Sequence, residues 1–378
     1  MAKPSVVRLV ERVIRDVRKR GDVAVREWSR KFGDAPSAGG FEIPRSQWQD
    51  AALAVAPDVR NAISMAARHV RRVCRKQLPR PFSLRVCEGV RVQQRVQPFD
   101  RVGCYVPGGR YPLPSSLLMT VIPAITAGVR DVTVVCPNPT PEVLFAALEA
   151  GASRVLRIGG AQAIAALAYG TRTIGAVEMI AGPGNAWVAT AKELVSNDCA
   201  IDMHAGPSEI VVWADDGNAE WIAADLLAQA DHDPDARAIL VTTSRKLAAG
   251  VRTALAGAGE IVVVRNRTDA IAAIDRIAPE HLVCANARDA ASVRSAGTIF
   301  VGRWSAQAAG DYTTGSNHVL PTSGAARFRG GLTPADFVRV FTVQTISRQG
   351  LQAIGPAAAA FADAEGLQAH ARSIRIRL

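Results

Sequence analysis

Short apolar strands alternate with helix-length segments through two long stretches of the chain, residues 102–195 and 210–301. The predicted strands of the first stretch are 102–106, 132–136, 155–158 and 177–181, and those of the second are 210–213, 238–242, 260–264, 281–285 and 297–301. Strands that are apolar along their whole length and separated by helices are typical of parallel sheets buried on both faces. We therefore predict the α/β class, with two Rossmann-like doubly wound parallel-sheet domains and helical N- and C-terminal segments.

Helical patterns precede and follow these two stretches. Apolar residues recur at near-helical spacing in residues 4–31 and 47–75, and residues 334–373 also read as helices with breaks at glycine and proline. A chain of 378 residues is longer than one ordinary core organises. We predict a discontinuous first α/β domain from residues 1–104 and 210–330, a second α/β domain from residues 105–209, and a helical tail from residues 331–378.

The charge balance is basic but diffuse. Lysine and arginine outnumber aspartate and glutamate by 45 to 34, and the basic residues fall at helical spacing rather than in one block. No aromatic-interleaved motif of the kind that binds RNA accompanies them, so we expect no nucleic-acid partner. The positive charge favours attraction of an anionic cofactor or substrate instead.

Cysteine usage and hydropathy indicate a cellular compartment. The six cysteines form no CxxC pair, which is typical of free thiols in a reducing cytosol. Charged residues recur from Lys3 through Arg20, where a signal peptide would be apolar, and no apolar run reaches membrane-spanning length. We expect a soluble, cytoplasmic protein without a membrane partner.

The stretch around Gln229 and His232 is the first candidate for chemistry. These two residues are three positions apart at the end of an apolar helical segment, so they share one helix face, and Pro234 stops the helix soon after them. An amide oxygen and an imidazole held in this way can form half of a metal site. The alternative is an ordinary polar helix end.

Further imidazoles and carboxylates occur in polar loops. His281 follows Glu280, His318 and Asp311 share a glycine-containing loop, and His370 lies near the C-terminus. Loops at strand ends hold the ligands in parallel-sheet proteins, so these residues suggest one composite site, although a lone loop histidine is usually only solvated.

Two chemical roles follow from residue type. A zinc ion takes about four nitrogen or oxygen ligands where cysteines are unsuitable, and two imidazoles and two oxygens are available for it from Gln229, His232, Asp311 and His370. A site that abstracts a proton needs a neutral imidazole near neutral pH, and the pair Glu280-His281 places a carboxylate beside one. Adjacent strand residues point in opposite directions, but Pro279 favours a loop.

Glycine-rich turns follow several predicted strands. Residues 182–185 (GPGN) lie between a strand and a helix, where backbone N–H groups can approach an anion, and residues 107–109 and 159–160 occupy similar positions. Tight turns of an α/β fold explain the same glycines equally well. These turns alone leave the cofactor and the substrate open.

Eight motifs, in this order, resemble those of the histidinol dehydrogenase family, and together they span nearly the whole chain. They are residues 103–109 (GCYVPGG), 159–164 (GGAQAI), 182–185 (GPGN), 201–209 (IDMHAGPSE), 226–232 (LLAQADH), 278–282 (APEHL), 310–322 (GDYTTGSNHVLPT) and 365–370 (EGLQAH). The resemblance implies a zinc- and NAD-dependent enzyme that oxidises L-histidinol to L-histidine through a bound aldehyde, in the last step of histidine biosynthesis.

The resemblance also implies residue roles. Glu280 corresponds to the carboxylate that activates water for the second oxidation, and His281 to the general base that takes the alcohol proton. The zinc ligands implied are Gln229, His232, Asp311 and His370; the NAD-contacting residues are Tyr105, Gln162 and Asn185, within residues 105–209; and the substrate-contacting residues are Ser208, Gln229, His232, His281, Asp311, His318, Glu365 and His370. The family is homodimeric with intertwined tails, so residues 331–378 are expected to be exchanged between subunits that share their active sites.

Two alternatives remain at this point. The segment between His232 and Glu280 is shorter than the family pattern, and Trp187 stands where tyrosine or phenylalanine is usual. Such departures allow a paralogous zinc- and NAD-dependent dehydrogenase of another amino alcohol or polyol. The alternative from a different class is a zinc hydrolase, which would use the same ligands to activate water without NAD.

Overall fold

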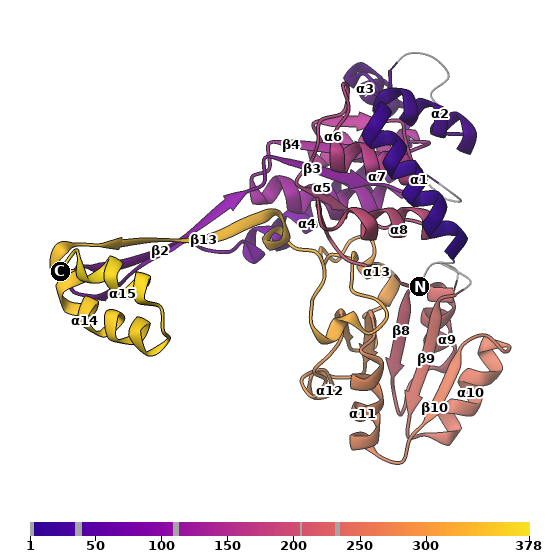
Figure 1. The fold of residues 1–378 in the computed structure, drawn as a ribbon. Helices are drawn as coiled ribbons and strands as arrows, with labels where there is room; N and C mark the ends of the chain where they lie inside the picture. Colours follow the sequence, from indigo (N-terminus) through magenta and orange to yellow (C-terminus); the bar gives the residue numbers. More distant parts are fainter. Residues whose placement is uncertain (1–3, 35–39, 109–112, 205, 231–234) are drawn as a thin grey trace. The chain divides into compact units, whose positions relative to one another are not determined.

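The computed structural model describes residues 4–34, 40–108, 113–204, 206–230 and 235–378 (Figure 1). The chain divides into two units, the first formed by residues 1–77 and 100–337 and the second by residues 78–99 and 338–378. The first unit contains two parallel sheets and the second a small antiparallel sheet with two helices. The predicted α/β class with parallel sheets and helices at both ends is therefore confirmed.

The first parallel sheet has five strands in the order β5-β4-β3-β6-β7. Its strands are β3 (Arg101–Tyr105), β4 (Asp131–Val135), β5 (Arg154–Leu156), β6 (Met179–Ala181) and β7 (Ala200–Ile201). The strands β3 and β4 are almost entirely buried, as expected for strands covered on both faces. The strand order reverses between β3 and β6, and ligands of doubly wound sheets bind beyond the carboxyl ends of the strands at such a point.

Helices cover both faces of this sheet. They are α1 (Pro4–Arg20), α2 (Asp22–Phe32), α3 (Arg45–Ala54), α4 (Pro57–Gln77), α5 (Pro114–Ala127), α6 (Pro141–Ala150), α7 (Gly160–Tyr169) and α8 (Ala186–Val195). The apolar stripes of α1 and α2, with Val10, Val17 and Trp28 buried, pack against α7 and α8 (Figure 1). These contacts differ from the predicted grouping of residues 1–104 with 210–330, because β3 and the N-terminal helices belong to the first sheet.

The second parallel sheet repeats the same order, β10-β9-β8-β11-β12. Its strands are β8 (Glu209–Trp213), β9 (Arg237–Thr242), β10 (Glu260–Val263), β11 (His281–Cys284) and β12 (Thr298–Val301). The helices α9 (Ala219–Ala230) and α10 (Arg245–Leu255) pack on one face, and α11 (Arg267–Ile277) packs on the other. Two short helices, α12 (Ala287–Ala290) and α13 (Gln307–Gly310), follow β11 and β12.

The segment after the second sheet returns to the helices of the first sheet. The side chain of Asn317 donates to the carbonyl of Met119 in α5 (2.7 Å), and the 3₁₀ helix η2 (Pro334–Phe337) contacts α4 and α5. A shorter 3₁₀ helix, η1 (Ala325–Arg327), precedes it. This return path fixes the loop that carries Asp311 and His318.

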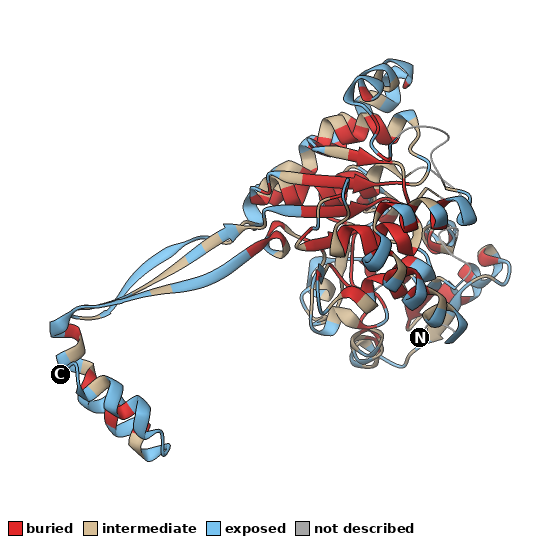
Figure 2. Ribbon diagram, turned by 45° about the horizontal axis from the view of Figure 1, so that its top comes forward, coloured by how far each residue is buried: buried red, intermediate tan, exposed pale blue. Residues whose placement is uncertain are grey.

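The second unit corrects one prediction. Residues 334–373 read as helices from sequence, but Val338–Ile346 forms strand β13, which pairs antiparallel with β2 (Val90–Pro98). The strand β1 (Phe82–Cys87) pairs with the other edge of β2, and the helices α14 (Arg348–Ala364) and α15 (Gln368–Arg375) follow β13. Much of this unit is exposed (Figure 2), including Phe361 and Ile376, whose exposed fractions are 70% and 71%.

Two expectations concern the whole chain. All six cysteines lie in the described ranges as free thiols, five of them buried. Within the described residues no helix combines the length and the apolar character needed to cross a membrane.

Candidate active site

The predicted catalytic residues gather at the amino ends of the strands of the second sheet. Helix α9 follows β8 and runs back along the sheet, so Gln229 in its last turn lies near the level at which β11 begins with His281. Asp311 follows α13 directly. Three segments far apart in sequence therefore deliver side chains to one region.

The side chain of Gln229 is buried, but its amide group has no hydrogen-bond partner among the described residues. Its exposed fraction is 1%, and neither the amide oxygen nor the amide nitrogen has a hydrogen-bond partner among the described residues. A buried amide without partners is unfavourable by roughly 1–3 kcal/mol, so such groups in native proteins usually have a partner or a ligand. The orphaned amide therefore marks a position where an external group is accommodated.

Asp311 lies between two imidazoles. Its Oδ1 atom is 3.9 Å from Nε2 of His281 and 3.9 Å from Nδ1 of His318, while its backbone carbonyl lies 2.9 Å from Nδ1 of His318. The histidine–carboxylate distances exceed direct hydrogen bonds. The Asp311 carboxylate therefore lies 3.9 Å from each of the two imidazoles.

Gln307 holds Asp311 in this position. Its fully buried side chain donates from Nε2 to Oδ2 of Asp311 (3.2 Å), and its backbone N–H donates to the carboxylate of Asp225. Oδ1 of Asp311 is thereby the oxygen that faces the imidazoles. Sequence reasoning missed Gln307, although its position four residues before Asp311 was a usable signal.

Glu280 and His281 approach each other despite their adjacent positions. Oε2 of Glu280 is 3.8 Å from Nδ1 of His281, and both side chains are about 5% exposed. Glu280 is the last residue before β11, and Ala278 just before it has a left-handed φ of 50°. The loop that Pro279 predicts therefore lets both side chains reach the same place.

Glu280 is a carboxyl group with strongly altered acidity. Burial is the main cause that raises the pKa of Glu280 to about 8. The charges of Asp311 and Glu209 act in the same direction, and hydrogen bonds from the Glu209 N–H (3.1 Å) and the Ser208 hydroxyl oppose them. A carboxyl group with this pKa exchanges protons near neutral pH. Ser208, predicted from sequence as a substrate contact, touches this carboxyl group directly.

The remaining residues predicted for the site are His232, Glu365 and His370. His232 falls outside the described residues. Glu365 and His370 belong to the second unit, at the C-cap of α14 and within α15, with exposed side chains. Gly366, with φ of 76°, separates the two helices, so Glu365 and His370 do not share one helix face. Within the described ranges no three His, Cys, Asp or Glu side chains are grouped closely enough to hold a metal ion.

The predicted cofactor residues lie together at the carboxyl edge of the first sheet. Tyr105 ends β3, Gln162 lies in the first turn of α7, and Asn185 is the N-cap of α8. Oη of Tyr105 accepts from the Gly160 N–H (3.2 Å), and burial raises the pKa of Tyr105 to about 12, so the phenol stays neutral. Helix N-termini at this edge favour an anionic group such as a pyrophosphate.

A buried polar network supports this edge. The amide of Gln162 donates to Asp34 (3.1 Å), whose carboxylate also accepts from the Gly159 N–H (3.1 Å). Burial raises the pKa of Asp34. Asp34 was not predicted as a functional residue, since it lies outside the α/β alternation.

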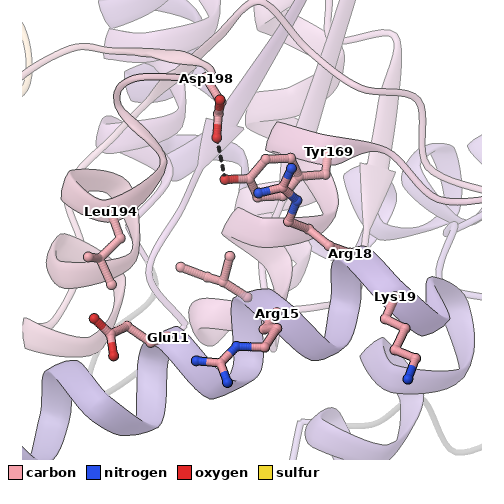
Figure 3. Close-up of a pocket in the computed structure, with 8 residues that line it drawn as sticks. Glu11, Arg15, Arg18, Lys19, Tyr169, Leu194 and Asp198 are labelled. Atoms are coloured by element: carbon pink, nitrogen blue, oxygen red, sulfur yellow. Dashed lines mark hydrogen bonds between the residues drawn. The ribbon is translucent and has the colours of Figure 1, made fainter.

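A cavity of about 490 Å³ lies between α1 and the C-terminal ends of α7 and α8 (Figure 3). Its walls include Arg15, Arg18 and Lys19 of α1, with Tyr169 and Leu194 near the C-terminal ends of α7 and α8. The Tyr169 hydroxyl donates to Asp198 (2.8 Å), and the Arg18 guanidinium lies 4.3 Å from the tyrosine ring centroid. Because Gln162 and Asn185 are at the opposite ends of the same helices, this cavity is separate from the cofactor edge.

A second cavity, of about 520 Å³, lies at the carboxyl ends of β8 and β11. Trp213, Trp221 and Cys284 are among its lining residues. The catalytic cluster begins at the amino end of β11, so this cavity lies at the other edge of the sheet.

Comparisons with known proteins identify the family of this chain. The sequence model described as histidinol dehydrogenase matches residues 1–378. A histidinol dehydrogenase from Acinetobacter baylyi is 43% identical over 99% of this chain and 93% of its own length. The enzyme of that name from Bradyrhizobium diazoefficiens is 44% identical over 97% of this chain and 91% of its own.

Solved structures agree. The crystal structure of histidinol dehydrogenase from Elizabethkingia anophelis has a TM-score of 0.95 and 32% identity, and the match covers 100% of this chain and 93% of that one. An aldehyde dehydrogenase from Brucella melitensis biovar abortus 2308, at 12% identity and a TM-score of 0.50, shares the fold alone, with 90% of each chain covered. This chain therefore belongs to the histidinol dehydrogenase family, NAD-dependent oxidoreductases that oxidise histidinol to histidine in histidine biosynthesis.

Proposed function

We propose that the oxidation proceeds at the cluster of Gln229, Glu280, His281 and Asp311, in two NAD-dependent steps through bound L-histidinal. The observation that carries this assignment is the buried pair of Glu280 and His281 beside Asp311, in which burial raises the pKa of the Glu280 carboxyl group to about 8. Ser208 and His318 contact members of this cluster and are proposed to bind the substrate, together with Glu365.

His281 and Glu280 have separate tasks in this proposal. His281 takes the hydroxyl proton of histidinol as hydride leaves the carbinol carbon for NAD. Glu280, once ionised, takes a proton from the water that adds to the aldehyde. The resulting hydrate then gives up its second hydride from the same carbon to a second NAD, and the product is the carboxylic acid. The burial of both side chains excludes bulk water and strengthens their interactions with the reacting groups.

A zinc ion is proposed at Gln229, His232, Asp311 and His370. The fit rests on the orphaned amide of buried Gln229 and on the Asp311 carboxylate oxygen that Gln307 leaves facing the cluster. Bound zinc would orient the amino alcohol and polarise its oxygen. These ligands also contact the substrate in the proposed site.

The cofactor is proposed to bind at the first sheet, at Tyr105, Gln162 and Asn185. Their common position at the carboxyl edge of the first sheet, beside the point where the strand order reverses, supports this assignment.

The protein is proposed to act as a homodimer in which the tail of residues 331–378 completes the partner's site. Large apolar side chains exposed on the second unit, such as Phe82, Phe341 and Phe361, support an intersubunit role because isolated monomers rarely expose so many. Glu365 and His370 then serve whichever site their tail reaches.

The test of the activity is NADH formation from L-histidinol, NAD and zinc between neutral and alkaline pH. Two NADH per histidinol and L-histidine as product are expected. Parallel assays with other amino alcohols and polyols test whether the enzyme is a paralogue that prefers another substrate. Calorimetric titration of NAD tests the hydrolase alternative, which predicts that NAD does not bind. Absence of NADH at every pH, from a protein that binds NAD, would exclude histidinol as the substrate.

The metal assignment predicts an effect of Gln307 on zinc affinity. Gln307→Leu removes the hydrogen bond that orients Asp311, and loss of such outer partners lowers metal affinity by roughly 10- to 100-fold. Competition against a chromogenic chelator measures the change. Gln47→Leu, on the exposed face of α3, is the matched control and should leave zinc affinity unchanged. Equal affinity of both variants would contradict the role of Asp311 as a ligand held by Gln307.

A further inference from the structure

A buried ion pair holds the turn that precedes α8. The backbone N–H of Gly182 donates to Oδ2 of Asp202 (2.7 Å), and the backbone carbonyl of the same glycine accepts from Nζ of Lys192 (2.9 Å). Lys192 also donates to Oδ1 of Asp202, which closes the arrangement around Gly182. Both polar groups of one turn residue are therefore held by a single pair of side chains.

Only glycine fits at position 182. Gly182 has φ of 119°, and a Cβ atom there would lie 2.1 Å from the carbonyl oxygen of Tyr105 at the end of β3. The turn thus lies directly against the backbone of a proposed cofactor residue. Asp202 reaches it because β7 pairs with β6, so their carboxyl ends are neighbours.

The depth of the ion pair requires an explanation. The side chains of Lys192 and Asp202 are 3% and 1% exposed. Desolvation of two buried charges generally offsets their mutual attraction, so stability alone is a weak reason for such a pair. A buried ion pair that forms hydrogen bonds with both backbone groups of a turn residue instead favours one conformation of that turn.

We propose that the Lys192–Asp202 pair is a positioning device for the cofactor, which fixes the turn of residues 182–185 before NAD binds. This inference rests on the proposed contact between Asn185 and NAD. Oδ1 of Asn185 accepts from the N–H groups of Trp187 and Val188, so its side chain is locked to the first turn of α8. Lys192 lies further along the same helix and ties that helix to the turn.

The energetic consequence falls on NAD binding. When the turn is already ordered before NAD binds, binding does not carry the entropic cost of ordering it, and the affinity for NAD is higher. Neither Lys192 nor Asp202 is exposed to the cofactor edge, so their effect is transmitted through Gly182 and α8. The pair therefore acts on the cofactor and not on histidinol.

The test compares Asp202→Asn with a double variant, Lys192→Met with Asp202→Asn, which leaves no unpaired charge. The dissociation constant for NAD is expected to rise roughly 10- to 100-fold in both, the range expected for loss of a charged hydrogen bond. The KM for histidinol at saturating NAD should change less than about twofold. The matched control is Asp22→Asn, whose carboxylate bonds Thr171 and Thr173 beyond the C-terminal end of α7 and should leave NAD affinity unchanged.

Hydrogen exchange of the wild-type protein provides a measurement independent of folding in the variants. The amide of Gly182 should be protected without NAD. Exchange at the rate of an open loop, with protection only after NAD addition, would overturn the proposal, as would unchanged NAD affinity of folded Asp202→Asn. Asn185→Ala separates the two hypotheses: if it alone weakens NAD binding, only the positioning role is lost, and if it has no effect, the cofactor turn itself is misassigned.

Discussion

Replacement of His281 by asparagine is expected to lower kcat for histidinol oxidation by roughly 10²- to 10⁴-fold, the usual contribution of a general base. Asparagine has a similar size and can still form hydrogen bonds, but it cannot accept the hydroxyl proton. His281 is buried at the start of β11, so a loss of activity must be distinguished from a loss of stability of the second sheet. Steady-state rates and the midpoint of thermal unfolding should be measured on the same preparations.

The control is His69→Asn. His69 lies on α4, and its Nδ1 atom is 2.7 Å from the carbonyl of Thr313, a structural contact that asparagine can replace. Its kcat should stay near the wild-type value. A His281→Asn enzyme that retains full turnover would remove the general base from this assignment, because asparagine cannot take the hydroxyl proton.

Both parallel sheets could be predicted because their strands are buried on both faces. Such strands appear in the sequence as short, uninterrupted apolar runs. Strands β8 and β11, for example, are buried at every position. The common order of the two sheets was not predictable in the same way. It depends on pairings between strands separated by whole helices, which local sequence does not encode.

Strand β13 was missed for the opposite reason. It is largely exposed, so it lacks the apolar alternation that identifies a half-buried strand, and its partner β2 lies far away in the sequence. The remaining signal was local: valine, threonine and isoleucine dominate residues 338–346, and these side chains favour strands over helices. Helical periodicity on its C-terminal side led to an incorrect extension of the helix.

The site was predictable only where residues form motifs. Glu280 and His281 stand in a recognisable segment, whereas Gln307 and Lys192 lie on helices where a polar side chain ordinarily faces water. Burial of Lys192 depends on Asp202, which approaches it only through the pairing of β6 with β7. Positioning residues of this kind are products of tertiary packing, so local sequence patterns do not reveal them.

The second prediction with a large effect concerns Glu280. Its pKa of about 8 means that the carboxyl group is mostly protonated below that pH and accepts a proton only when ionised. Oxidation of the aldehyde should therefore accelerate as the pH rises towards about 8. Glu280→Gln should remove this acceleration and lower the aldehyde step by roughly 10²- to 10⁴-fold, since glutamine cannot take a proton from water.

The two half-reactions separate Glu280 from His281. With L-histidinal supplied directly, Glu280→Gln should fail to form histidine, whereas histidinol should still give a first NADH. Equal loss of both half-reactions would assign Glu280 to the alcohol step or to positioning of His281, which lies 3.8 Å away.

The pH dependence of protein stability tests the raised pKa of Glu280 independently. Because the pKa is raised from 4.5 to about 8 in the folded protein, the folded state binds more protons than the unfolded state between these values. The contribution of this carboxyl group to stability is then complete below pH about 4.5 and is lost as the pH rises to about 8. Denaturant unfolding at several pH values should show this decline in the wild type and a flatter profile in Glu280→Gln, and parallel profiles would mean that Glu280 is already ionised at neutral pH.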